Sequence, residues 1–142
     1  MLSLTTFIFS YSLSTFLKKR NIFWLAIGSL FPSIDFSLSF LGIIHRQNPF
    51  HSLTLLFLLS VFLYSLTKRK EIVHSFSLGY SVHLFLDLLS FEPIPLFYPL
   101  SFGYSLNLFY SSSFLPNFLL ILVSGIIILR KDFLKLIRIR QS

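Results

Sequence analysis

The chain has 142 residues, of which 54% are hydrophobic, and its formal net charge is +7. A soluble domain of this length could not shield so many large apolar groups from water, and the basic residues form separate clusters instead of one basic face, which argues against nucleic-acid binding. The absence of cysteine excludes disulfides and thiolate metal sites. We therefore expect an integral membrane protein.

Three basic clusters, at residues 18–20, 68–70 and 130–140, divide the apolar sequence into spans. Lys and Arg collect on the cytoplasmic side of a membrane, so the chain should cross an even number of times between clusters. The first apolar run precedes its basic cluster, which is the reverse of the order in a signal peptide. We expect a protein of the cytoplasmic (inner) membrane with its N-terminus outside and its C-terminus inside.

The predicted elements are five helices, at about residues 3–17, 22–44, 52–67, 72–91 and 114–129. Several are shorter than the roughly 20 residues of a usual span, and snorkelling Lys and Arg or local thinning of the bilayer would absorb the mismatch. The predicted fold is therefore all-α: one membrane-embedded domain over residues 1–142, built as a helix bundle of about five spans.

Two stretches depart from this helical pattern. Pro93, Pro95 and Pro99 would break a helix repeatedly, so residues 92–116 are predicted to form an irregular apolar segment over the outer ends of the bundle. The tail at about 130–142 alternates basic and apolar residues, which is typical of a segment lying on the anionic inner surface.

Five side chains that can bind metal gather in the outer half of this topology. Counted from the inner basic clusters at 1.5 Å per residue, three of them lie roughly 20–26 Å from the cytoplasmic edge, and two flank the outer loop. An aspartate within a span costs about 2.5–3.5 kcal/mol and needs a partner, which a divalent cation would supply. We predict metal ligands at Asp35, His45, His51, His83 and Asp87.

Small and polar residues recur at helical spacing on two of the predicted helices. One stripe holds Gly79, His83, Asp87 and Ser90, and the other holds Gly28, Pro32, Asp35, Ser39 and Gly42. Such faces pack closely in membranes, so we predict that the two stripes face each other. A straight helix over 22–44 would separate Asp35 from His45 by roughly 15 Å, so we expect this helix to break after Asp35.

The ligand types favour Zn²⁺ over Mn²⁺ or Fe²⁺, because imidazole and carboxylate occur without thiolate. A metal with an open position generates a nucleophile from water, with Asp35 and Asp87 as catalytic carboxylates, and Arg46 could bind a phosphate through its planar fork. Taken singly, each residue also has an ordinary interpretation: His83 and Asp87 could hydrogen-bond each other, and His45 and His51 could be plain loop residues. His74 is assigned no role, and Glu92 is interpreted as a solvated loop residue that is close enough to be a reserve ligand.

The stretches "GSLFPSID", "HRQNPFHSL" and "LGYSVHLFLDLLSFEPIPLFYP" resemble, in this order, three motifs of the LexA-regulated inner-membrane family of metal-dependent hydrolases, which is associated with the fold of zinc-dependent phospholipase C. The resemblance covers most of residues 28–99 and implies that the same five side chains bind metal. The chain departs from the family pattern at Thr6 and Ser33, where a histidine and an aspartate are usual.

The favoured function is hydrolysis of an ester, above all a phosphoester, at the outer face of the membrane. The expected partners are the lipid bilayer and a lipid or phosphoester substrate, with no nucleic acid, and the sequence sets no oligomeric state. One alternative is a non-catalytic protein of the same fold, which the departures at Thr6 and Ser33 favour. The other is a metal or proton transporter, which would need polar groups in the cytoplasmic half as well.

Overall fold

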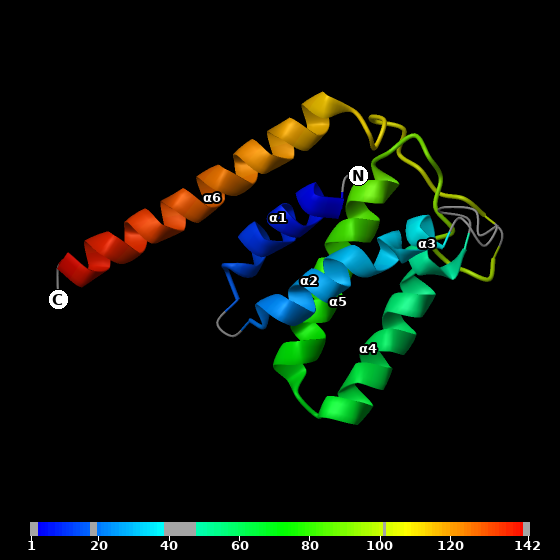
Figure 1. The fold of residues 1–142 in the computed structure, drawn as a ribbon, viewed down its shortest axis with the longest axis horizontal. Coiled ribbons are helices and arrows are strands. Elements are labelled where there is room, and N and C mark those ends of the chain that lie inside the picture. Colours follow the sequence, from blue (N-terminus) through cyan, green and yellow to red (C-terminus); the bar gives the residue numbers. More distant parts are fainter. Residues whose placement is uncertain (1–2, 18–19, 39–47, 101, 141–142) are drawn as a thin grey trace.

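The computed structural model describes residues 3–17, 20–38, 48–100 and 102–140, with the backbone alone at residues 37, 132 and 134–140. Its elements are α1 (Ser3–Ser14), α2 (Ile22–Leu30), the short 3₁₀ turn η1 (Phe31–Ser33), α3 (Ile34–Ser37), a second 3₁₀ turn η3 (Pro49–His51), α4 (Leu53–Thr67), α5 (Lys70–Leu88) and α6 (Phe114–Arg140) (Figure 1). Extended pairing within these described ranges consists of two isolated bridges, Ser90–Phe109 and Ile94–Tyr104. The all-α prediction is confirmed.

The helix predicted over residues 22–44 is divided into shorter pieces. α2 ends at Leu30, η1 follows with Pro32 near its start, and α3 ends at Ser37. Proline carries no N–H, so the α-helical hydrogen-bond pattern is interrupted there. The expected break after Asp35 agrees with the end of α3, and residues 39–47 lie outside the described residues.

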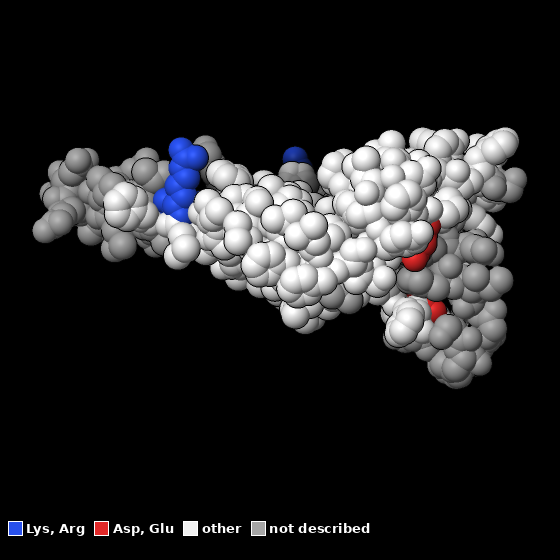
Figure 2. Space-filling model, turned by 90° about the horizontal axis from the view of Figure 1, so that it is seen from above, with Lys and Arg blue, Asp and Glu red and all other residues white. Residues whose placement is uncertain are grey.

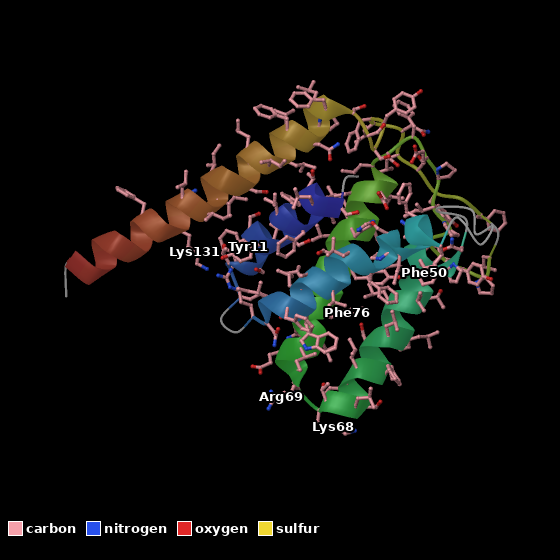
Figure 3. All side chains as sticks on the ribbon, viewed as in Figure 1. Tyr11, Phe50, Lys68, Arg69, Phe76 and Lys131 are labelled. Carbon is pink, nitrogen blue, oxygen red and sulfur yellow. The ribbon has the colours of Figure 1, made fainter. Side chains whose placement is uncertain are left out.

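A tight hairpin joins α4 to α5. Ser52 begins α4 by accepting a hydrogen bond from the N–H of Leu55 at 3.1 Å, and Lys68 ends it in the left-handed conformation, with φ of 54° and its N–H bonded to the oxygen of Tyr64. Figure 3 labels Lys68 and Arg69 at this turn, at the opposite end of α5 from the residues that follow Asp87. Lys68 and Arg69 of the second basic cluster therefore lie in the turn between two helices, as the sequence predicted.

The closest helix contact in the described structure is that of α2 with α5. A Cβ built on Gly28 would lie 2.1 Å from the main-chain oxygen of Phe76, and one built on Gly79 would lie 2.4 Å from that of Leu25. No side chain fits at these distances, so both positions require glycine. The prediction that these two stripes face each other is confirmed at Gly28 and Gly79.

α6 is longer than predicted. It continues through the basic residues to Arg140, so residues 130–140 of the predicted tail form the last turns of this helix. After Gly125 the chain has no proline or glycine, and Leu, Ile, Lys and Arg sustain an α-helix. Residues 92–113, by contrast, contain no helix among those described, as their prolines predicted.

Within the described residues, one helical stretch is long and apolar enough to cross a membrane by itself, Phe114–Lys131 of α6. The apolar stretches Ile22–Phe36 and Leu53–Thr67 are shorter. A bundle of five spans therefore stays a prediction. Figure 2 shows how few charges the visible face carries, with the basic and acidic groups well apart along the long axis.

Candidate metal centre

Four polar side chains from three separate elements meet in the interior. Asp35 comes from α3, His51 from η3, and His83 and Asp87 from α5. Their exposed fractions are 0%, 1%, 2% and 0% respectively. Burial of two carboxylates among apolar helices costs free energy unless a positive charge accompanies them. The cluster therefore needs an internal source of positive charge.

Helical geometry sets the first pair. His83 and Asp87 are one turn apart on α5, so their side chains lie on one face, and His83 Nε2 is 3.1 Å from Asp87 Oδ2. This relationship follows from the sequence spacing alone.

The turn η3 brings the third group to this pair. Asn48 caps the turn by accepting a hydrogen bond from the N–H of Phe50 at 3.2 Å, and Pro49 presets its backbone. The buried Tyr80 of α5 donates its hydroxyl to the main-chain oxygen of Phe50 at 2.6 Å. The residue after Phe50 is His51, so Tyr80 fastens the turn that carries this histidine.

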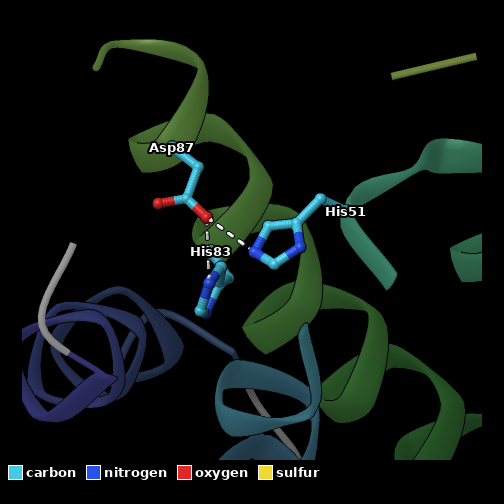
Figure 4. Close-up of side chains that lie close together, drawn as sticks. All are labelled: His51, His83 and Asp87. Carbon is cyan, nitrogen blue, oxygen red and sulfur yellow. Dashed lines mark ion pairs between the residues drawn. The ribbon is translucent and has the colours of Figure 1, made fainter. Parts of the chain in front are cut away.

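Three ligand atoms converge as a result. His51 Nε2 and His83 Nε2 each lie 3.1 Å from Asp87 Oδ2, and the set fits within 4.8 Å (Figure 4). Ligand atoms around a tetrahedral Zn²⁺, with bonds near 2 Å, stand roughly 3.3 Å apart. The two distances to Asp87 Oδ2 are close to this value, so the group could hold a metal ion.

The second nitrogen of each histidine has a fixed neighbour as well. His83 Nδ1 lies 2.6 Å from the main-chain oxygen of Ser29. A carbonyl oxygen only accepts, so Nδ1 carries a hydrogen, and Nε2 of the same ring faces Asp87. His51 Nδ1 lies 3.3 Å from Asp35 Oδ2. Metal-binding histidines characteristically give their other N–H to a carbonyl or a carboxylate. For His83 the neighbour is the carbonyl of Ser29, and for His51 it is the carboxylate of Asp35.

Asp35, which the sequence predicts as a metal ligand, lies beside the nitrogen of His51 that faces away from Asp87, and Asn48 Nδ2 donates to its Oδ2 at 3.3 Å. Direct binding of a metal by Asp35 stays a prediction. The geometry suits a residue that orients His51. Spacing along the chain gave no information about which nitrogen of the His51 imidazole Asp35 would face.

The electrostatics of His51 follow from the same neighbours. This residue lies in η3, outside the apolar helices. Burial, the largest effect, lowers the pKa of His51, but Asp35 and Asp87, through hydrogen bonding and charge, together raise it above its ordinary value of 6.5. A proton on His51 and a metal ion at the cluster would therefore compete for the same negative surroundings.

The structure gives a mixed account of the other predicted residues. His45 and Arg46 lie outside the described residues. His74 is exposed near the start of α5, and Glu92 is exposed and accepts a hydrogen bond from Ser111, so neither belongs to the cluster. At the positions of the family departures, Thr6 is buried and Ser33 accepts a hydrogen bond from Ser3 at 2.9 Å.

Sequence reasoning missed three supporting residues, Ser29, Asn48 and Tyr80. Asn48 had a signal, because Asn before Pro is typical of a turn whose side chain caps the backbone. Ser29 contributes only its main-chain oxygen, which no side-chain pattern reveals. Tyr80 acts through a contact with a residue 30 positions away.

Comparison with known proteins supports the membrane setting. A family model described as YdjM inner membrane protein matches residues 1–139. No curated protein and no solved structure matches the chain. The inner-membrane prediction is confirmed at the level of the family, whereas the phospholipase C-like fold and the hydrolase activity stay predictions.

Proposed function

The chain belongs to the YdjM inner membrane protein family, and on this basis we propose that it is a membrane-bound, metal-dependent hydrolase that cleaves an ester, with a phosphoester as the favoured substrate. The observation that carries the proposal is the convergence of His51 Nε2, His83 Nε2 and Asp87 Oδ2 within 4.8 Å in the interior of a membrane protein.

The ligand set suits catalysis better than a purely structural role. Two imidazoles and one carboxylate match the three protein ligands of catalytic zinc sites, which keep a fourth position open for water or substrate. Zn²⁺ bound there would acidify a water molecule and polarise the ester. His45 as a further ligand and Arg46 as a phosphate-binding group belong to the same proposal.

The chain's own residues would prepare the ligands for this role. Ser29 holds His83 in the tautomer that presents Nε2, because its carbonyl oxygen accepts the Nδ1 hydrogen. Asp35 holds the ring of His51 from its other nitrogen and makes that imidazole a stronger ligand. The carboxylate of Asp87 faces both Nε2 atoms and offsets part of the ionic charge.

The proposed topology is five spans with the N-terminus outside and the C-terminus inside. It is supported by the positions of the basic groups. Lys70 and Asp87 are 17 residues apart on α5, or roughly 26 Å along its axis. Arg20 lies over the ring of Tyr11, and Lys131 lies over that of Phe16, so both gather at the end of α1 (Figure 3).

Metal analysis of the purified protein tests the site. Wild type should carry about one zinc or another divalent ion per chain, and His83→Ala and Asp87→Ala should lose it. His74→Ala is the matched control, because His74 is exposed on the same helix outside the cluster. Unchanged metal content in the first two variants would refute the site.

Turnover tests the reaction. The zinc-loaded protein in micelles should release product from a chromogenic phosphodiester, and Asp87→Ala should not. Metal binding without turnover of phosphodiester, phosphomonoester or carboxyl ester substrates would identify a non-catalytic member of the fold. Metal flux into proteoliposomes without hydrolysis would identify a transporter.

A further inference from the structure

The segment that joins α5 to α6, residues 91–113, has an unusual surface, and we call it the aromatic segment. Glu92 is its only charged residue. Large apolar side chains that are 38–65% exposed cover it: Phe91, Phe97, Tyr98, Leu100, Phe102, Tyr104, Leu106, Leu108 and Tyr110. An ordinary loop in water is rich in charged and small polar side chains, so this surface is adapted to a partner that is not water.

The backbone of the aromatic segment is paired to an extent that a water-exposed loop does not need. The N–H groups of Ile94 and Tyr104 each bond to the other's oxygen, at 3.0 and 2.9 Å. Further main-chain bonds tie the N–H groups of Phe91, Leu106 and Leu108 to the oxygens of Phe109, Leu88 and Leu89. Its three prolines carry no N–H at all. Irregular backbone near lipid is tolerated only when its polar groups have such partners.

The aromatic segment is also attached directly beside the metal centre. At α5 it begins four residues after Asp87, and the hydroxyl of Ser90 donates to the main-chain oxygen of Asp87 at 2.7 Å. At α4 the N–H of Leu53, two residues after His51, donates to the oxygen of Leu96 at 2.9 Å. Because of these attachments, the metal centre lies at nearly the same depth in the membrane as the aromatic segment.

We propose that the aromatic segment inserts into the outer leaflet at the boundary between lipid headgroups and acyl chains. Aromatic side chains favour this boundary, and the internal pairing of the backbone lowers the cost of leaving water. α4 and α6 also expose apolar side chains, such as Phe57 and Phe114, which lipid would cover in an inner membrane protein.

The insertion has a consequence for the substrate. It seats the metal centre close to the level of the lipid phosphates, so the substrate class is the phosphoester of a membrane lipid. The assignment of a lipid phosphoester as substrate rests on the proposed hydrolase function, whereas the insertion itself does not.

Fluorescence in lipid vesicles tests the insertion. The chain has no cysteine, so single variants Phe102→Cys and Leu106→Cys can each carry one polarity-sensitive probe. Both probes should emit at shorter wavelength than the free probe does in buffer, and they should be quenched more by headgroup and shallow-chain spin labels than by aqueous iodide. Arg69→Cys, at the basic turn, is the control and should show the opposite preference.

Two results would overturn the insertion. The first is iodide quenching of Phe102→Cys and Leu106→Cys equal to that of the control. The second is protection from both quenchers together with disulfide cross-linking between copies of the chain, which would assign the surface to a second copy. Repeating the measurement in Asp87→Ala separates the two proposals, because insertion should persist there even though metal is lost.

The assignment of a membrane lipid as the substrate is tested separately. Replacing Leu100, Leu106 and Leu108 together by Ser should lower the rate on a phospholipid in vesicles severalfold relative to the rate on a soluble phosphodiester. An unchanged ratio would refute lipid as the substrate. Absence of hydrolysis of either substrate by wild type would refute the proposed function and leave the insertion to be judged by fluorescence.

Discussion

His83 Nδ1 lies 2.6 Å from the main-chain oxygen of Ser29, although the two residues are 54 positions apart in the chain. This contact joins α5 to α2 at the level of the candidate metal centre. It exists because the two helices touch backbone to backbone at Gly28 and Gly79. The close packing of α2 against α5 therefore also orients His83, a candidate metal ligand.

Gly79→Ala should separate α2 from α5. Its added Cβ would meet the main-chain oxygen of Leu25 at 2.4 Å, which the backbone can relieve only by moving. We expect a loss of about 1–3 kcal/mol in the free energy of unfolding, typical of overpacking, together with weaker metal binding. Thermal unfolding in detergent and zinc titration measure both.

Gly125→Ala is the matched control for that substitution. A Cβ at Gly125 meets nothing within 4 Å, so this variant should unfold at the wild-type temperature or slightly above it. Equal destabilisation by both variants would contradict the packing explanation.

Asp35→Asn should weaken metal binding without abolishing it. The amide keeps the size of Asp35 but removes the charge that faces His51 Nδ1, and loss of such a partner typically costs about 10–100-fold in affinity. Competition with a chromogenic chelator gives the dissociation constant. Complete loss of metal, as expected for Asp87→Asn, would instead identify Asp35 as a direct ligand.

Acidification should have opposite effects on the metal-bound and metal-free protein. The pKa of His51 is raised in the folded protein. With chelator present and no metal bound, protonated His51 therefore stabilises the fold. This stability is fully present below the unfolded pKa of about 6.5 and is lost as pH rises through the folded pKa. With zinc, stability should instead fall as pH is lowered, because the proton displaces the ion. Unfolding temperatures measured from pH 5 to 9, with and without chelator, test both pH dependences. His51→Gln should remove the pH dependence of the metal-free protein.

Tyr80→Phe should loosen the turn that carries His51. The variant loses the hydroxyl that donates to the main-chain oxygen of Phe50, a bond worth about 1 kcal/mol. We expect slightly lower stability and weaker zinc binding with an unchanged ligand set, which the visible spectrum of the cobalt-substituted protein reports. Tyr110→Phe, on the exposed surface, serves as control. A wild-type zinc affinity for Tyr80→Phe would show that η3 holds His51 without this bond.

The sequence by itself determined the relationships that lie within one helix. Apolar runs bounded by prolines and basic clusters predicted α1, α4 and α5 to within a few residues, since hydrophobic patterning and missing N–H groups act locally. The pairing of His83 with Asp87 followed from their spacing of four residues, because the geometry of an α-helix leaves little freedom. The membrane setting followed from composition.

Only the tertiary structure decided how the helices and turns meet. The approach of α2 to α5 selected the oxygen of Ser29 as the partner of His83, and the turn from Asn48 to Ser52 turned His51 so that one nitrogen faces Asp87 and the other faces Asp35. Spacing along a helix gives the position of a residue along the helix axis. It does not give which nitrogen of an imidazole ring that residue will face. That choice depends on how segments far apart in sequence pack against one another.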